Sequence, residues 1–214
     1  RGSVSIAMTA KTLNQRSNST DSISAISSNN IWNDSVLIER ALAGDTFAEN
    51  AIFRRHAPYL LNLAARLTRR ISESDDIVQE TFLTAFAKLG KLEKPEAFKL
   101  WLVRILVSKV RKTFRVRRLK AFFGMDSGRE DATLLMLAVH DANPDLRSEL
   151  KEIDTVLQKM PIDWRTTWMF HRIEGMSIKE TAETVNRSVA TVKRYVTAVD
   201  VAVKSRYKVY NEGI

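Results

Sequence analysis

Residues 160–196 read MPIDWRTTWMFHRIEGMSIKETAETVNRSVATVKRYV. This stretch predicts three helices, separated by Gly175 and by a tight turn at Asn186, a residue that tolerates the left-handed conformation. Ser177 followed by Glu180 three residues later has the sequence of a capping box, which starts a helix. Two amphipathic helices joined by so short a turn are typical of a helix-turn-helix.

The last of these helices, which begins after Ser188, has two unlike faces when its residues are placed at about 100° intervals. The apolar face consists of Val192, Tyr195, Val196, Val199 and Val203, and the opposite face of Lys193, Arg194, Thr197 and Lys204. β-Branched residues suit a packed face, whereas cations and a hydroxyl suit base edges and phosphates in the major groove. A solvated charged face is the alternative, but the adjacent turn and capping box favour a DNA-binding recognition helix.

The composition of the whole chain limits the kind of partner and fold that it can have. It has 214 residues, with 34 Lys and Arg against 25 Asp and Glu, a formal charge of +9. That surplus favours nucleic acid or an anionic membrane as a partner, although a merely soluble basic protein has the same balance. The apolar spacing is helical throughout and no strand is predicted, so we expect an all-α fold. We find neither a signal-peptide pattern nor an apolar run of about 18 residues, and we therefore expect a cytoplasmic protein.

The residue types argue against an enzyme. The chain has no Cys, and its three His are scattered, so we expect no metal site and no cofactor. The nearest carboxylate cluster, Asp75, Asp76 and Glu80, alternates with a core pattern and indicates a contact face. We predict no catalytic residue and no small-molecule substrate, which leaves a nuclease as the least favoured alternative.

Four segments follow one another along the chain. Residues 1–33 are rich in Ser, Asn and Thr and predict a disordered tail. Residues 34–118 predict a helical bundle, and residues 147–210 contain the helix-turn-helix. Residues 119–146 carry Gly and Pro and predict a flexible linker with a short apolar patch at 134–139. The predicted helix starts in the bundle are Asn33 or Asp34, Asp45 or Thr46, Ser72 and Pro95.

The bundle helix that follows Ser72 has an acidic face with a leucine in it. Its apolar arc contains Ile77, Val78, Thr81, Phe82, Ala85 and Leu89, and the acidic face contains Asp75, Asp76, Gln79, Glu80 and Leu83. A solvated face does not need Leu83, so the acidic face favours contact with a basic protein surface. Single exposed leucines are common, and an ordinary solvated face remains the alternative.

The helix that follows Pro95 has an apolar arc and a basic one. The apolar arc contains Phe98, Trp101, Leu102, Ile105 and Leu106, and the arginine stripe on the far side contains Arg104, Ser108, Arg111, Arg115 and Arg118. Residues 97–121 hold nine Lys or Arg and no acid, a pattern that suits a phosphate backbone. A membrane-binding helix would expose apolar bulk beside its charge, whereas this apolar arc is assigned to the core.

Three passages resemble bacterial RNA polymerase sigma factors of the extracytoplasmic-function (ECF) group, in the sigma-70 family. SESDDIVQETFLTAF at residues 72–86 is similar to the family's Asp-x-x-Gln-Glu-x-Phe helix. AFKLWLVRIL at residues 97–106 resembles the Phe-x-x-Trp-Leu-x-x-Ile core of the promoter-melting helix, and the stretch quoted first resembles the closing helix-turn-helix. With Gly44–Asp45, the resemblance covers most of residues 34–118 and 147–208.

The resemblance implies an alternative sigma factor that directs promoter-specific transcription initiation and is controlled by an anti-sigma factor. Residues 34–118 would form a sigma-2-like domain, residues 147–210 a sigma-4-like domain for the −35 element, and the linker would pass the RNA-exit region of the polymerase. The residues implied to bind the clamp of the largest core polymerase subunits are Asp75, Asp76, Gln79, Glu80 and Leu83. Those implied to bind and melt the −10 element, beside the loop at 89–98, are Trp101, Arg104, Ser108, Arg111, Lys112 and Arg115. Those implied to bind the −35 element are Arg187, Ser188, Thr191, Lys193, Arg194 and Thr197.

Some residues depart from the family pattern. Ser108 stands where Asn is common, and Lys112 where Asp or Asn is common. Ala198 and Asp200 replace a frequent Arg-Ala-Arg, which predicts weaker phosphate anchoring after the recognition helix. The main alternative is a stand-alone helix-turn-helix regulator of transcription, which leaves the acidic face and the arginine stripe without a role.

Overall fold

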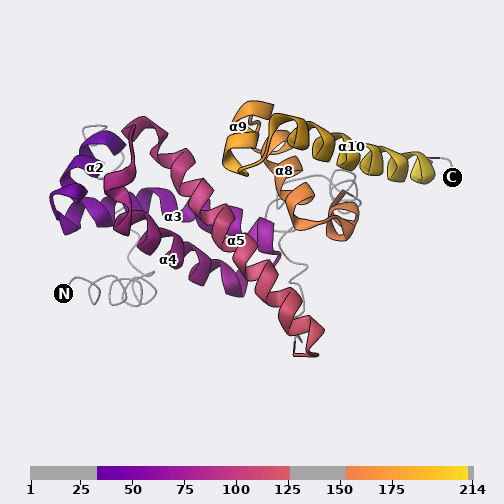
Figure 1. Ribbon diagram of the computed structural model, residues 1–214, viewed down its shortest axis with the longest axis horizontal. Coiled ribbons are helices and arrows are strands. Elements are labelled where there is room, and N and C mark those ends of the chain that lie inside the picture. Colours follow the sequence, from indigo (N-terminus) through magenta and orange to yellow (C-terminus); the bar gives the residue numbers. More distant parts are fainter. Residues whose placement is uncertain (1–32, 126–152, 212–214) are drawn as a thin grey trace, which may run out of the picture.

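The computed structural model describes residues 33–125, the N-terminal block, and residues 153–211, the C-terminal block. The N-terminal block contains α2 (Asp34–Leu42), α3 (Thr46–Thr68), α4 (Ile71–Ala87) and α5 (Phe98–Phe122), with short 3-10 helices η1 (Leu89–Lys91) and η2 (Pro95–Ala97) before α5 (Figure 1). The C-terminal block contains α8 (Ile162–Arg172), α9 (Ile178–Thr184) and α10 (Val189–Asn211). No strand occurs in these two ranges, and the predicted all-α fold with two helical units is confirmed for them.

Side-chain caps start the first two helices where the sequence predicts. The Asn33 side chain accepts a hydrogen bond from the Val36 amide at 3.0 Å, and α2 begins one residue after Asn33. The Asp45 carboxylate accepts from the Phe47 amide at 2.9 Å at the start of α3. Each acceptor satisfies an amide that has no partner inside its helix.

The predicted cap at Ser72 is wrong. Helix α4 begins at Ile71, and its N-cap is Arg70, whose side chain forms no capping hydrogen bond. The connection from α3 is short because Arg69, at φ 59°, turns the chain in the left-handed region. The Arg70 amide is held instead by the Thr68 hydroxyl, at 3.2 Å, so the end of α3 fixes the start of α4.

The apolar arcs predicted for the bundle form its core. The predicted arc of α4 is buried throughout, and Phe98, Leu102 and Leu106 of α5 are fully buried. Trp101 and Ile105, expected to be buried with them, are half-buried at the edge of this core.

The helix-turn-helix has the predicted local geometry. Ser177 and Glu180 form both hydrogen bonds of a capping box at the start of α9. Asn186 adopts φ 48° in the turn. The Ser188 hydroxyl accepts from the Thr191 amide at 3.1 Å and starts α10. The apolar face of α10 packs inward, with Val192, Val196 and Val199 buried.

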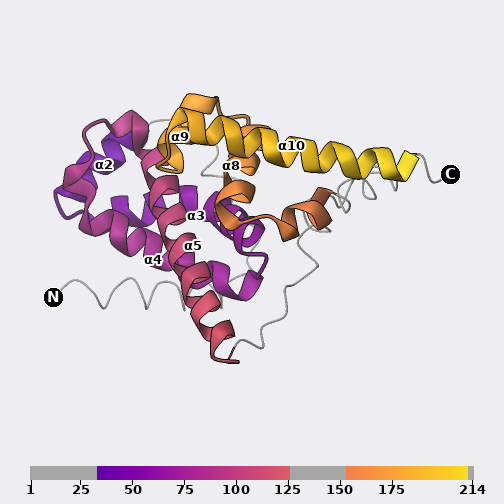
Figure 2. The ribbon, with the colours of Figure 1, turned by 45° about the vertical axis from the view of Figure 1, so that its right-hand side comes forward.

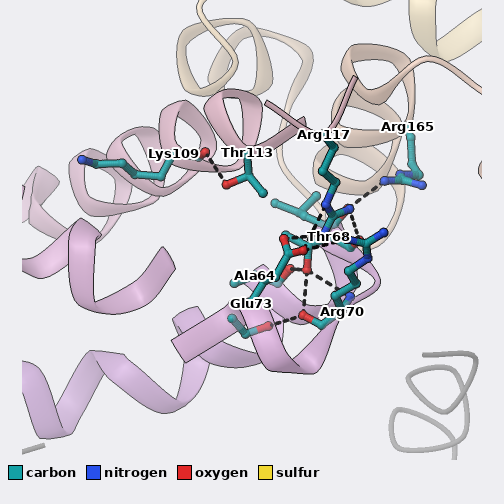
Figure 3. A network of polar contacts seen from close by, with 10 residues as sticks. Ala64, Thr68, Arg70, Glu73, Lys109, Thr113, Arg117 and Arg165 are labelled. Atoms are coloured by element: carbon teal, nitrogen blue, oxygen red, sulfur yellow. Dashed lines mark hydrogen bonds and ion pairs between the residues drawn. The ribbon is translucent and has the colours of Figure 1, made fainter. Parts of the chain in front are cut away.

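The two blocks pack against each other at the carbonyl end of α3 (Figure 3). Arg165 of α8, only 4% exposed, donates from Nη2 to the Leu67 carbonyl at 2.8 Å. Arg117 of α5 donates from Nη1 to the Thr68 carbonyl at 3.1 Å. Both guanidinium groups lie over the Phe114 ring, at 5.4 and 4.8 Å from its centroid. Cations from both blocks thus satisfy carbonyls at the negative end of the α3 dipole.

Helix α5 runs beyond the predicted end of its domain at residue 118 and ends at Phe122. Several predictions concern residues outside the described ranges. The tail at 1–32, the remaining linker at 126–146 and its apolar patch at 134–139 stay predictions.

The turn at Asn186 gives a first test. We expect Asn186→Ala to lower the free energy of unfolding by about 1 kcal/mol, because a Cβ-bearing residue without a local hydrogen-bonding side chain is strained at positive φ. Asn186→Gly is the matched control and should cost less, since glycine adopts this conformation freely. Urea unfolding followed by circular dichroism measures both, and equal losses would contradict the left-handed assignment.

Candidate polymerase and promoter surfaces

The acidic face of α4 is open to solvent. Asp75, Asp76 and Glu80 are exposed, Leu83 is 44% exposed, and Gln79 is half-buried. In both views α4 lies across the N-terminal block from α9 (Figures 1 and 2). The predicted protein-binding residues therefore share one accessible surface while the blocks are packed together.

One member of this face already has a partner. Lys109 of α5 lies 3.3 Å from the Glu80 carboxylate, whose side chain remains 53% exposed. An exposed pair of this kind contributes little to stability, so Glu80 can exchange it for a partner's cation.

The arginine stripe of α5 divides into an exposed part and a covered part. Ser108, Arg115 and Arg118 are exposed, as is the neighbouring Lys112. Arg104 and Arg111 instead contact the C-terminal block, where they meet acceptors that the sequence did not predict as partners. Three residues provide these acceptors, namely Asp163, Glu183 and Val185.

The contacts of the covered arginines are direct. Arg104 Nη2 lies 2.9 Å from Glu183 Oε2. Arg111 Nε donates to Asp163 Oδ1 at 2.8 Å, and its Nη1 donates to the Val185 carbonyl at 2.8 Å. The C-terminal block therefore occupies the donors that the sequence assigns to DNA.

Asp163 joins the two predicted DNA surfaces. Its second oxygen accepts from Arg187 Nη2 at 2.6 Å, in the turn before α10. Burial raises the pKa of Asp163, but hydrogen bonds and charge from Arg187 and Arg111 outweigh it and hold that pKa below its ordinary value. The carboxylate is thus ionised and shared between an α5 arginine and a helix-turn-helix arginine.

The −35 residues predicted on α10 differ in their roles. Lys193, Arg194 and Thr197 are exposed on one side of the helix. Ser188 and Thr191 are engaged in the N-terminal cap, where their hydroxyl oxygens lie 2.8 Å apart. Among the predicted −35 residues of α10, the three exposed side chains are therefore the accessible candidates for base or phosphate contact, and the Arg194 guanidinium also lies 5.6 Å from the centroid of the Tyr195 ring.

Asp200, which stands where the family pattern often has an arginine, has a structural role. Its Oδ1 accepts from Trp168 Nε1 at 2.8 Å, and it also forms an ion pair with Arg172. Both partners belong to α8, so Asp200 anchors the recognition helix to the helix behind it. Burial raises the pKa of Asp200, but these hydrogen bonds and the Arg172 charge outweigh burial and hold the pKa below its ordinary value.

The end of α5 corrects one argument from the sequence. Its last turns project beyond the other described helices (Figures 1 and 2), and they expose Leu119, Phe122, Phe123 and Met125. The apolar residues of α5 are therefore not all buried in the core. The first turns of α5 bury their apolar residues, as the sequence predicts, but its end exposes apolar residues beside cations, as membrane-binding helices do.

Two general properties concern the described residues alone. Within them, no helix is both long and apolar enough to cross a bilayer. The same ranges contain no group of His, Cys, Asp or Glu side chains arranged to hold a metal ion.

Comparison with known proteins supplies the family. The model of Sigma-70 region 2 matches residues 52–120, and that of Sigma-70, region 4 matches residues 150–198. The chain is 30% identical to the RNA polymerase sigma factor NccH of Alcaligenes xylosoxydans xylosoxydans, over 75% of this chain and 87% of NccH. It is 32% identical to the ECF RNA polymerase sigma factor SigM of Mycobacterium tuberculosis, over 75% of this chain and 77% of SigM. The chain belongs to the ECF group of RNA polymerase sigma factors.

Solved structures of sigma factors share its fold. CnrH, in complex with the cytosolic domain of CnrY, matches with a TM-score of 0.57 and 23% identity over 82% of this chain and 97% of that one. RpoE from Bartonella quintana, in complex with the anti-sigma factor NepR, matches with a TM-score of 0.58 and 22% identity over 75% and 96%. The resemblance inferred from the sequence is confirmed. This sigma factor is a transcription initiation factor that binds core RNA polymerase and promoter DNA.

Asp200 gives a prediction about pH. Its pKa is lowered in the folded protein, so its contribution to stability is complete above the ordinary value of 3.8 and is lost as the pH falls through the folded pKa. We expect Asp200→Asn to be less stable than the parent at neutral pH and to lose less stability on acidification. Thermal unfolding from about pH 7 to about pH 3 measures this. Parallel profiles for parent and variant would contradict the assignment, and Glu39→Gln, at an exposed site of α2, is the control.

Proposed function

We propose that this sigma factor binds the clamp of the largest polymerase subunits through the acidic face of α4. The observation that carries the proposal is Leu83, exposed among the carboxylates of Asp75, Asp76 and Glu80. Water satisfies exposed carboxylates, whereas an exposed leucine gains free energy only when a partner covers it. A basic partner surface with an apolar centre fits both features.

The −10 element is bound by α5 and the loop before it, residues 89–98. Ser108, Lys112 and Arg115 are exposed on α5, and Trp101 is half-buried near the start of that helix. Melting a duplex costs unstacking energy, which stacking and backbone contacts to the separated strand recover. A helix with cations on one side and an aromatic residue near its start supplies both kinds of contact.

The −35 element is bound by the helix-turn-helix. Lys193, Arg194 and Thr197 project from the first half of α10, the part of a recognition helix that meets base edges. Because Asp200 is bonded to Trp168, anchoring to phosphate falls to residues before α10. Arg187 in the turn is the nearest cation, and phosphate would have to replace its partner Asp163. Affinity for DNA is consequently modest without polymerase.

Control by an anti-sigma factor, in the cytoplasm, completes the proposal. It is supported by the two similar solved structures, whose sigma factors are bound to the cytosolic domain of CnrY and to the anti-sigma factor NepR. In this scheme residues 34–118 form the sigma-2-like domain, residues 119–146 the linker and residues 147–210 the sigma-4-like domain. Residues 1–33 are the disordered tail.

The competing function is that of a helix-turn-helix regulator that acts without polymerase. Binding to core polymerase distinguishes a sigma factor from such a regulator. The sigma factor should co-purify with core polymerase and give transcripts from a random promoter library. A protein that binds promoter DNA but never core polymerase would overturn the proposal.

The acidic face is tested by charge reversal. We expect Glu80→Lys to weaken binding to core polymerase about tenfold, because it places a cation against a basic surface. Glu39→Lys on α2 makes the same change in charge at an exposed site outside the acidic face. Fluorescence anisotropy titration with core polymerase measures both, with circular dichroism as the check on folding. Equal affinities would contradict the assigned face.

The recognition helix is tested with Arg194→Ala. A side chain that reads a base contributes about 1–3 kcal/mol of discrimination, so we expect about tenfold less transcription from promoters selected for their −35 element. Lys159→Ala removes a cation from an exposed site before α8, outside the predicted DNA-binding residues, and is the matched control. In vitro transcription with saturating core polymerase measures the effect, and an unchanged promoter preference would argue against base reading by Arg194.

A further inference from the structure

Residues of the C-terminal block contact two members of the arginine stripe, Arg104 and Arg111. Helix α9 lies beside α5 in both views (Figures 1 and 2). The Glu183 carboxylate meets Arg104, while the Asp163 carboxylate and the Val185 carbonyl meet Arg111. Every group that α8, α9 and the turn after α9 present in these contacts is a hydrogen-bond acceptor.

This set of acceptors resembles a nucleic-acid backbone in its chemistry. Arg104 and Arg111 lie seven residues apart, which places them on one side of α5 about 10 Å apart along the axis. A guanidinium group binds carboxylate and phosphate with the same planar fork of donors. An arginine whose donors are filled by Asp163 or Glu183 cannot offer them to phosphate at the same time.

We propose that the C-terminal block is an internal competitor for promoter DNA, with Asp163, Glu183 and the Val185 carbonyl occupying the phosphate-binding groups of α5. The proposal rests on the assignment of α5 to the −10 element. It adds that the factor exists in a closed form, in which this surface is filled, and that DNA binding by α5 requires the blocks to separate.

Further polar contacts join the blocks. Glu174 accepts from Tyr59 at 3.0 Å and pairs with Arg66 at 2.7 Å. Asp154 forms an ion pair with Arg69. The side chains of these pairs are 10–23% exposed, so the charges must be hydrated or paired again when the blocks separate. Phosphates and charged polymerase groups can replace these contacts, whereas Arg165, buried at the end of α3, must be released as well.

Closure affects the two DNA surfaces differently. Lys193, Arg194 and Thr197 are exposed while the blocks are packed, so the recognition helix is not covered by α5. Asp163 holds Arg187 as well as Arg111, so it also fills one cation of the predicted −35 set. The competitor therefore acts on the −10 contacts of α5 and on Arg187, and it leaves Lys193, Arg194 and Thr197 accessible.

The absence of cysteine allows the closed form to be followed directly. A donor and an acceptor dye are attached at Arg54→Cys on α3 and Ser205→Cys on α10, both exposed sites. The test variant, Asp163→Asn with Glu183→Gln, removes two negative charges from the competing surface. Glu39→Lys changes the net charge by the same amount on α2 and is the matched control. The DNA probe is a fluorescein-labelled, mixed-sequence single strand of about 20 nucleotides, long enough to follow one binding site.

We expect the double variant to lower the energy transfer and to bind the probe about tenfold more tightly than Glu39→Lys does. Unchanged energy transfer would overturn the closed form held by these acids. Lower transfer with an affinity equal to that of Glu39→Lys would overturn the competition. Glu183→Gln alone, at a half-exposed carboxylate, should shift both readouts in the same direction by a smaller amount, and it guards against misfolding of the double variant.

A further variant separates this proposal from the function on which it rests. Arg115 is exposed and lies outside the covered part of the stripe. In the double variant, Arg115→Ala should lower probe affinity without changing energy transfer. If it leaves affinity unchanged, the assignment of α5 to DNA fails and the competition fails with it. If it lowers affinity while the double variant itself gains none over Glu39→Lys, the competition alone fails.

Discussion

The carbonyl end of α3 is the point on which the arrangement of the two blocks depends. The last carbonyls of a helix have no partner within it and lie at the negative end of its dipole. Here Arg117 serves the Thr68 carbonyl from within the bundle, and Arg165 serves the Leu67 carbonyl from α8. Because Arg165 is buried, its bond to the Leu67 carbonyl holds α8 at this end of α3. In the same arrangement α9 contacts α5.

Neighbouring arginines of the same helix serve different purposes. Arg117 pairs with Glu73 and caps α3, whereas Arg118, the next residue, is exposed. Both belong to a run of cations, and from the sequence alone either one is an equally good candidate for binding phosphate. Their separation follows from helical geometry, since residues one apart point about 100° from each other.

Local features of the fold could be predicted from the sequence, and contacts between distant segments could not. The capping box at Ser177, the left-handed Asn186 and the apolar arc of α4 each depend on residues within one or two turns. The same rules fail at Ser72, because the left-handed Arg69 ends α3 and lets α4 begin at once. The roles of Arg165 and Asp200 depend on which helices meet, and no spacing within the chain encodes that.

The candidate surfaces follow the same division. Their positions on exposed helix faces could be predicted from periodicity, as Leu83 and Arg194 show. Their occupancy could not, because long side chains such as Arg104 and Arg111 reach acceptors that lie tens of residues away in the chain. The roles of Asp163 and Glu183 could not be predicted either, since an acidic residue near a helix end gives no sign of a distant partner.

The opposite placement of the acidic face and the covered arginines bears on how the molecule behaves inside a bacterium. A chain with a charge of +9 meets a chromosome that offers millions of sites of sequence-independent attraction. If Arg104 and Arg111 are filled by the chain's own carboxylates, as proposed above, the free factor offers fewer cations to that reservoir, while the acidic face on the other side remains open to polymerase. The proposed closed form would then favour an order of assembly in which the enzyme comes first and the chromosome second.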